Sequence, residues 1–92
     1  TGQLRLIASP DGREGSVTIH QDALLYATKL DGDKDVTHRL TTGRRAYVHV
    51  ARGVVALNGT PLVAGDGARI EQETSLQLSN GRAAEVLVFD LP

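Results

Sequence analysis

The sequence predicts an all-β domain built as an antiparallel barrel or a two-sheet sandwich. Apolar and polar residues alternate in short runs, which is the period-two pattern of half-buried strands. Gly, Pro, Asn and Asp separate these runs at a spacing of about ten residues, as they do in sandwiches and barrels. No run has the periodicity of a helix. At 92 residues, the chain is expected to be a single domain.

The apolar runs give the expected order of strands. The first runs cover residues 4–8, 17–20, 24–30 and 36–40, with a hairpin turn at 31–34 before the last of these. Gly53 ends a run over 46–51, and Val54 begins another that reaches Leu57. The final runs cover 68–71, 76–78 and 85–89. The residues expected in the core are Val48, Val50, Val54 or Val55, Leu57, Leu76, Leu78, Val86 and Val88.

Two Asn-Gly pairs predict tight hairpins, at Asn58-Gly59 and at Asn80-Gly81. A two-residue type I′ turn needs a positive φ at both central residues, and Asn followed by Gly meets that need best. The segment Gly65-Asp66-Gly67 is glycine-rich, like loops that bind phosphate, but no helix follows it as such a loop requires. It is therefore expected to form a tight turn.

Composition excludes several classes of function. Ten Lys and Arg residues face eleven Asp and Glu residues, so the net charge of −1 provides no attraction to nucleic acid or an anionic membrane. Three aromatic residues are too few for a platform that stacks bases. No apolar run approaches the ~20 residues of a membrane span. Cysteine is absent, which excludes disulfides and thiolate chemistry and fits a cytoplasmic location.

The chain is expected to be a piece of a longer protein. It contains no Met, and strand-like segments lie close to both of its ends.

Three histidines, His20, His38 and His49, are the only weak candidates for metal ligands. Metal-binding barrels usually place two His residues two apart on one strand, and no such pair occurs here. His49 alternates with Val48 and Val50, so it is expected to face outward. His38 shares a face with Val36 and Leu40, so it is expected to be an inward, hydrogen-bonded histidine.

Other polar motifs have ordinary structural explanations. His20 and Asp22 share a strand face, but only Ser16 is near as a nucleophile, so a structural hydrogen bond is expected rather than catalysis. Asp31, Asp33 and Asp35 begin like a calcium loop, but the Gly and Glu that such a loop needs later are missing. The glycosylation sequon at residues 58–60 is explained by the predicted turn.

The segments at residues 9–16, 19–26, 47–70 and 85–92 together resemble the C-terminal half of a pirin-like, quercetin dioxygenase-type bicupin. The middle segment, residues 47–70 with Gly53, Asn58-Gly59 and Gly65-Asp66, is similar to the centre of a cupin. Residues 9–16 with 19–26 are similar to the opening of the second cupin. Val36-Thr37-His38 and Arg44-Arg45 lie where that half has comparable residues. Residues 85–92 resemble its closing strand, so the resemblance spans nearly the whole chain.

The resemblance implies a cupin barrel, or jelly-roll sandwich, whose residues 1–92 follow an N-terminal cupin that is absent from this sequence. That absent half is implied to hold a divalent metal, and some family members open quercetin with dioxygen. The general cupin pattern places its metal-binding Glu seven residues before the strand-ending Gly, which is Ala46 here. Its two His positions fall near Arg39 and Thr41, with His38 out of phase by one, and no His follows His49.

These observations favour a metal-free structural half that packs against the catalytic half and stabilises it. We expect no catalytic, cofactor-binding or metal-binding residues in this domain, and no enzyme activity from this chain alone. The expected partner is the N-terminal cupin of the same protein, and a homo-oligomer stays open. The alternatives are a module that binds a small molecule inside the barrel, and a self-contained dioxygenase that uses the three histidines.

Overall fold

The computed structural model describes residues 3–32, 34–71 and 74–92. Within these residues the chain forms one short 3-10 helix, η1 (Arg13–Gly15), and eight strands. The strands are β1 (Arg5–Ser9), β2 (Val17–Thr18), β3 (Leu24–Leu30), β4 (Val36–Arg39), β5 (Arg45–Leu57), β6 (Thr60–Val63), β7 (Gly67–Ile70) and β8 (Ser75–Leu91). The expected all-β architecture is therefore confirmed. No helix in the described ranges is long and apolar enough to cross a membrane.

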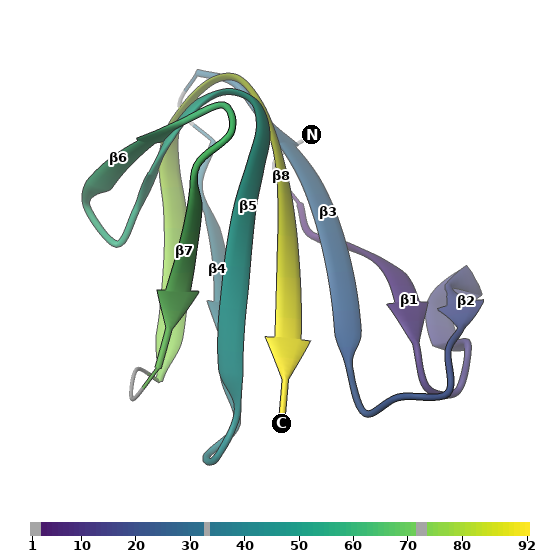
Figure 1. Cartoon of the computed structure of the whole chain (residues 1–92). Coiled ribbons are helices and arrows are strands. Elements are labelled where there is room, and N and C mark those ends of the chain that lie inside the picture. The colour runs from purple at the N-terminus through teal and green to yellow at the C-terminus, as the bar shows by residue number, and fades with distance from the viewer. Residues whose placement is uncertain (1–2, 33, 72–73) are drawn as a thin grey trace.

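Two long strands, β5 and β8, belong to both layers of the sandwich. The first part of β8 pairs with β4 and with the end of β5, whereas its last part lies between β3 and the start of β5. Figure 1 shows both strands bending over the top of the molecule, with β7, β5, β8, β3 and β1 in front and β4 behind. The two layers are thus one continuous, folded sheet.

The bends explain why two expected strand ends are wrong. Gly53 was expected to end a strand, and Asn80-Gly81 to form a hairpin, yet β5 and β8 run through these positions. Gly53, Asn80 and Ala83 have positive φ values of 72°, 53° and 48°, and the β5–β8 register shifts three times beside them. These are β-bulges, in which positive φ bends a strand without ending it.

Two further expectations about pairing are also wrong. β3 and β4 do not form a hairpin, because they pair with different parts of β8. Asp33, in the middle of that expected turn and of the acidic motif, lies outside the described residues. The short β1–β2 pair is parallel, an exception in an otherwise antiparallel sheet.

The hairpin at Asn58-Gly59 is confirmed. Leu57 pairs with Thr60 across this two-residue turn, and the φ values of Asn58 and Gly59 are 48° and 85°. The turn at Gly65-Asp66 is present as well, where Asp66 accepts a hydrogen bond from the backbone N–H of Val63 at 2.9 Å.

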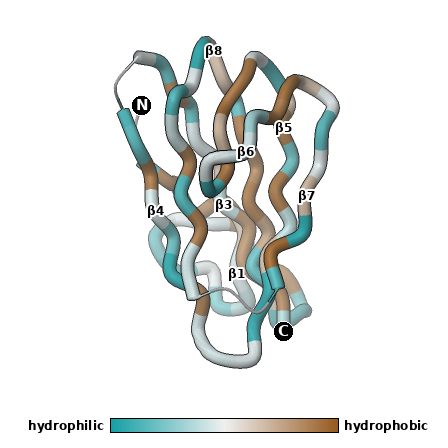
Figure 2. Tube along the Cα trace, turned by 90° about the vertical axis from the view of Figure 1, so that its left-hand side faces the viewer, coloured by the Kyte–Doolittle hydropathy of each residue, from teal (hydrophilic) through white to brown (hydrophobic). Residues whose placement is uncertain are grey.

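The core lies between the two layers, and Figure 2 shows apolar and polar residues alternating along its strands. The predicted core is confirmed, with Val55 rather than Val54 as the buried member of that pair: their exposed fractions are 2% and 36%. Side chains with almost no exposure fill the centre of the sandwich, namely Leu30, Val48, Val50, Leu76, Leu78, Val86 and Val88.

Candidate functional site: an inward polar cluster

The three candidate histidines lie in different environments. His20 is exposed in the loop before β3, and His49 points outward from β5 opposite Leu87. His38 points inward from β4, as expected, and its side chain is only 12% exposed. Among the described residues, no three His, Asp or Glu side chains are placed to hold a metal ion together.

The positions matched to the cupin ligand pattern do not fit a metal either. Ala46 is buried with an exposed fraction of 2%, but its methyl side chain has no atom that can bind a metal. Arg39 and Thr41 are both exposed. A divalent metal needs several convergent lone-pair donors, and these residues do not provide them.

A carboxylate, Asp90, occupies the interior beside Ala46. Val86, Val88 and Asp90 alternate along β8, so all three point inward, and Asp90 is the direct cross-strand partner of Ala46. Its side chain is only 6% exposed. A buried carboxylate is costly unless positive charge and hydrogen bonds compensate for its lost hydration.

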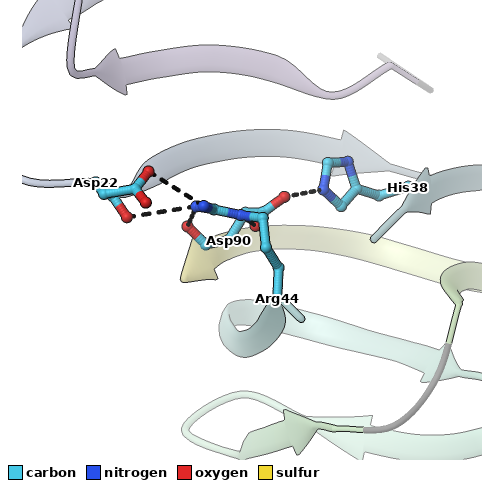
Figure 3. Close-up of polar contacts among 4 residues, drawn as sticks. All are labelled: Asp22, His38, Arg44 and Asp90. Atoms are coloured by element: carbon cyan, nitrogen blue, oxygen red, sulfur yellow. Dashed lines mark hydrogen bonds and ion pairs between the residues drawn. The ribbon is translucent and has the colours of Figure 1, made fainter. Parts of the chain in front are cut away.

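Arg44 provides that compensation from the loop between β4 and β5. Its Nε donates to Oδ1 of Asp90 at 2.5 Å, and one terminal nitrogen donates to the backbone oxygen of Asp90 at 3.0 Å. The same guanidinium donates to Oδ1 of Asp22 at 3.1 Å and to the Asp22 backbone oxygen at 3.4 Å. Figure 3 shows the guanidinium between the two aspartates. The hydrogen bond to Asp90 raises the pKa of Arg44 above its usual value, so the side chain stays charged.

His38 approaches Asp90 from the other layer. Its Nε2 lies 2.8 Å from Oδ2 of Asp90, and its ring stacks at an angle against Tyr26, with 4.8 Å between the ring centroids. Burial, followed by the charge of Asp90, raises the pKa of the Tyr26 hydroxyl. Both oxygens of the Asp90 carboxylate therefore have a partner, one from each side.

This arrangement can hold segments together but does not contain the parts of a hydrolytic triad. Asp22 is bound to Arg44 rather than acting as the partner of His20, and the hydroxyl of Ser16 bonds to Ser9 and to the backbone of Arg13. The cluster joins β4, the loop before β3, the loop before β5 and the end of β8 at one end of the sandwich.

Sequence reasoning missed Arg44 and Asp90 as a pair. The available signal was the alternation of Val86, Val88 and Asp90, which puts a charged residue on the inward face. Such a residue requires a partner of opposite charge, but nothing local indicates which of the basic residues it is.

A protein-family model and a curated relative both match this chain in sequence. Residues 6–91 match the family model described as "Quercetinase C-terminal cupin domain". Quercetin 2,3-dioxygenase of Escherichia coli K12 is 38% identical over 88 residues, which cover 96% of this chain and 38% of that protein. The chain thus spans about two fifths of the length of that curated relative.

Two solved structures from Escherichia coli superpose on this chain. The crystal structure of YhhW from Escherichia coli superposes with a TM-score of 0.94 and 36% identity, covering 100% of this chain and 39% of that one. The structure of the bacterial pirin YhhW in complex with nickel(II) superposes with a TM-score of 0.92 and 37% identity, over 97% of this chain and 39% of that one. The sandwich, its bent central strands and these similarities show that the chain belongs to the family of quercetinase C-terminal cupin domains.

Proposed function

We propose that this domain is the metal-free structural half of a two-cupin protein, and that it stabilises a metal-binding N-terminal cupin by packing against it. The observation that carries the proposal is an apolar face on the outside of the sandwich, in a domain whose interior is filled with Leu and Val side chains. Family membership supports the proposal, because the matching model describes a C-terminal cupin.

The outer face consists of six residues on β3, β8 and β5, three strands that lie side by side in Figure 1. Leu25, Phe89 and Tyr47 form one cross-strand row, and Tyr47 and Phe89 have ring centroids 6.2 Å apart. The second row consists of Ala27, Leu87 and His49. Tyr47 is exposed and the other five residues are half-buried. An apolar area that a sheet leaves partly open to solvent is typical of an interface.

Charged residues surround the outer face. Lys29 and Arg52 both approach Glu85 at one edge, at 3.7 and 3.0 Å, whereas Arg45 and Arg69 lie toward the opposite edge. An apolar centre with a charged rim is the usual anatomy of a protein interface. Because the rim carries more basic than acidic residues, we expect acidic residues around the matching surface of the partner.

The start of the described chain lies at the same surface. Gln3 and Arg5 line a shallow hollow of about 480 Å³ together with Ala27 and Leu87 of the outer face. A domain joined ahead of β1 would therefore lie next to this face. We assign the N-terminal cupin of the same polypeptide as its occupant.

A chimera tests the packing. This domain replaces the C-terminal cupin of Escherichia coli quercetin 2,3-dioxygenase, and Leu87→Lys is compared with Val63→Lys, which changes an exposed residue on β6. We expect Leu87→Lys to lower the melting temperature of the chimera more than that of the isolated domain, because it places a charge in the interface. An equal effect of both variants in the chimera contradicts the assigned face.

A metal titration tests the metal-free role. The isolated chain is loaded with nickel, iron, manganese or zinc, desalted and subjected to elemental analysis, and its oxygen consumption is measured with quercetin. We expect less than one retained equivalent and no oxygen consumption. One tightly held equivalent that is lost in His38→Ala would overturn the proposed role.

A further inference from the structure

At one end of the sandwich, oxygens of the buried Asp90 and of the exposed Asp22 surround the Arg44 side chain. Four oxygen atoms from two residues accept hydrogen bonds there: the Oδ1 and backbone oxygens of Asp90 and of Asp22. Each acceptor receives its bond from Arg44, and the donors are three nitrogens of one planar guanidinium. A planar guanidinium has several N–H groups in fixed directions, so it can donate to all of these oxygens at once. A compact cation such as an ammonium group could not do so.

The guanidinium of Arg44 lies close to the position at which the cupin pattern has its metal-binding Glu. It binds the carboxylate of Asp90, the direct cross-strand partner of Ala46, and Ala46 is where the cupin pattern places a metal-binding Glu. This end of the cupin therefore has a buried carboxylate, that of Asp90, with a cation bound to it. The cation is the guanidinium of Arg44, which belongs to the chain itself.

The donor set argues against a metal in the same place. His38 and Arg44 lie on different oxygens of Asp90, as Figure 3 shows, and Asp22 lies on the other side of the guanidinium. The acceptors are thus spread along a flat group rather than converging on one point. No three metal-ligating side chains are grouped in the described part of the chain, which agrees with this geometry.

We propose that the oxygens of Asp22 and Asp90 form a binding site for a planar guanidinium cation, that Arg44 is its permanent occupant, and that this site takes the place of metal binding in this half. The inference deepens the proposed metal-free function and rests on it. It predicts that a free alkylguanidinium can replace the Arg44 side chain, whereas a divalent metal cannot.

Chemical rescue of Arg44→Ala tests the site, with Arg45→Ala as the matched control. Arg45 is the next residue, is 59% exposed and approaches Glu71 only at 3.9 Å. We expect Arg44→Ala to lower the folding equilibrium constant at least about tenfold, because Asp90 loses its buried counter-ion. Arg45→Ala should change it by less than about fivefold, as is usual for exposed ion pairs.

Ethylguanidinium chloride is then added at millimolar concentration, and melting temperatures are measured. We expect a saturable rise for Arg44→Ala and none for Arg45→Ala. Ethylammonium chloride, which has the same charge but a single nitrogen, should raise the melting temperature of Arg44→Ala less. The double variant Arg44→Ala/Asp90→Asn should not respond, because its anionic acceptor is gone.

Three outcomes would overturn the proposal: equal effects of ethylguanidinium on both single variants, rescue that persists in the double variant, or stronger rescue by zinc or nickel than by ethylguanidinium. If Arg44→Ala does not fold without additive, it is refolded with each additive already present, and the same comparisons decide. Tight metal binding by the unchanged chain would overturn the proposed function, whereas absence of rescue would overturn only the guanidinium site.

Discussion

The hydroxyl of Tyr47 lies where a Cβ atom at Gly67 would have to be. Tyr47 is on β5 and Gly67 is the first residue of β7, the neighbouring strand of the same layer. Because residue 67 has no side chain, the Tyr47 ring can extend across to β7 and widen the apolar outer face. This contact involves the far end of a flexible side chain, which can move aside.

Gly67→Ala and Gly53→Ala should therefore have different costs. At Gly53 the new Cβ would meet backbone atoms of Arg82 and Ala83, which cannot move independently, and the φ of 72° is strained for alanine. We expect Gly53→Ala to lower the free energy of unfolding by about 1–3 kcal/mol. Gly67→Ala should lower it by about 0.5 kcal/mol or less, since only Tyr47 has to move. Urea denaturation of both variants measures the difference, and equal losses would mean that β5 and β8 adjust easily at their bend.

The turn at Asn58-Gly59 gives a test of backbone strain alone. A Cβ at Gly59 would meet no atom within 4 Å, so a clash does not contribute. Gly59→Val should still lower the free energy of unfolding by about 1–3 kcal/mol, because a β-branched residue is strained at positive φ. Gly59→Asn is the control and should cost less, since Asn tolerates that region. A melting curve of Gly59→Val that matches the unchanged chain would contradict the turn type.

A substitution of Leu76 tests how tightly the side chains between the two layers are packed. It is fully buried on the first part of β8, whereas Val63 on β6 is 52% exposed. Leu76→Ala should lower the free energy of unfolding by about 2–5 kcal/mol through lost burial and a residual cavity. Val63→Ala should stay within about 0.5 kcal/mol of the unchanged chain. Far-ultraviolet circular dichroism follows the unfolding, and similar losses for both variants would show a loosely packed interior.

Alkaline pH should destabilise the domain through Tyr26. Burial and the charge of Asp90 raise the pKa of its hydroxyl above the usual 10.0, so the folded state holds this proton more tightly than the unfolded state does. The corresponding stability is complete below pH 10.0 and is lost as the pH rises above it. Tyr26→Phe should reduce the slope of stability against pH in this window. Tyr47→Phe, which removes a hydroxyl from the outer face, is the matched control, and identical slopes for Tyr26→Phe and the unchanged chain would contradict the effect.

The strands, the core and one hairpin could be predicted from the sequence, because each depends on residues that are close together in the chain. Alternation at Val48 and Val50 reflects one strand lying between core and solvent, and Asn58-Gly59 carries its turn geometry in two residues. The inward direction of His38 was predicted from the same alternation with Val36 and Leu40.

The bends and the polar cluster depend on distant parts of the chain and could not be predicted in the same way. Positive φ at Gly53 and Asn80 suits both a turn and a bulge, and only pairing with the other long strand distinguishes them. His38 and Asp90 are 52 residues apart, and Arg44 and Asp90 are 46 apart. No local pattern selects Arg44 over Arg45 as the residue that turns toward Asp90.

The position of β8 has a consequence for how the domain is made. This strand follows every other described strand in the chain, yet it lies at the centre of both layers, between β3 and β5 and beside β4. On the ribosome, β3, β4 and β5 would therefore emerge before the strand with which all three pair has been synthesised. Neither layer can close until β8 has left the exit tunnel, so folding of this domain must begin late and join many distant segments at once, which slows it.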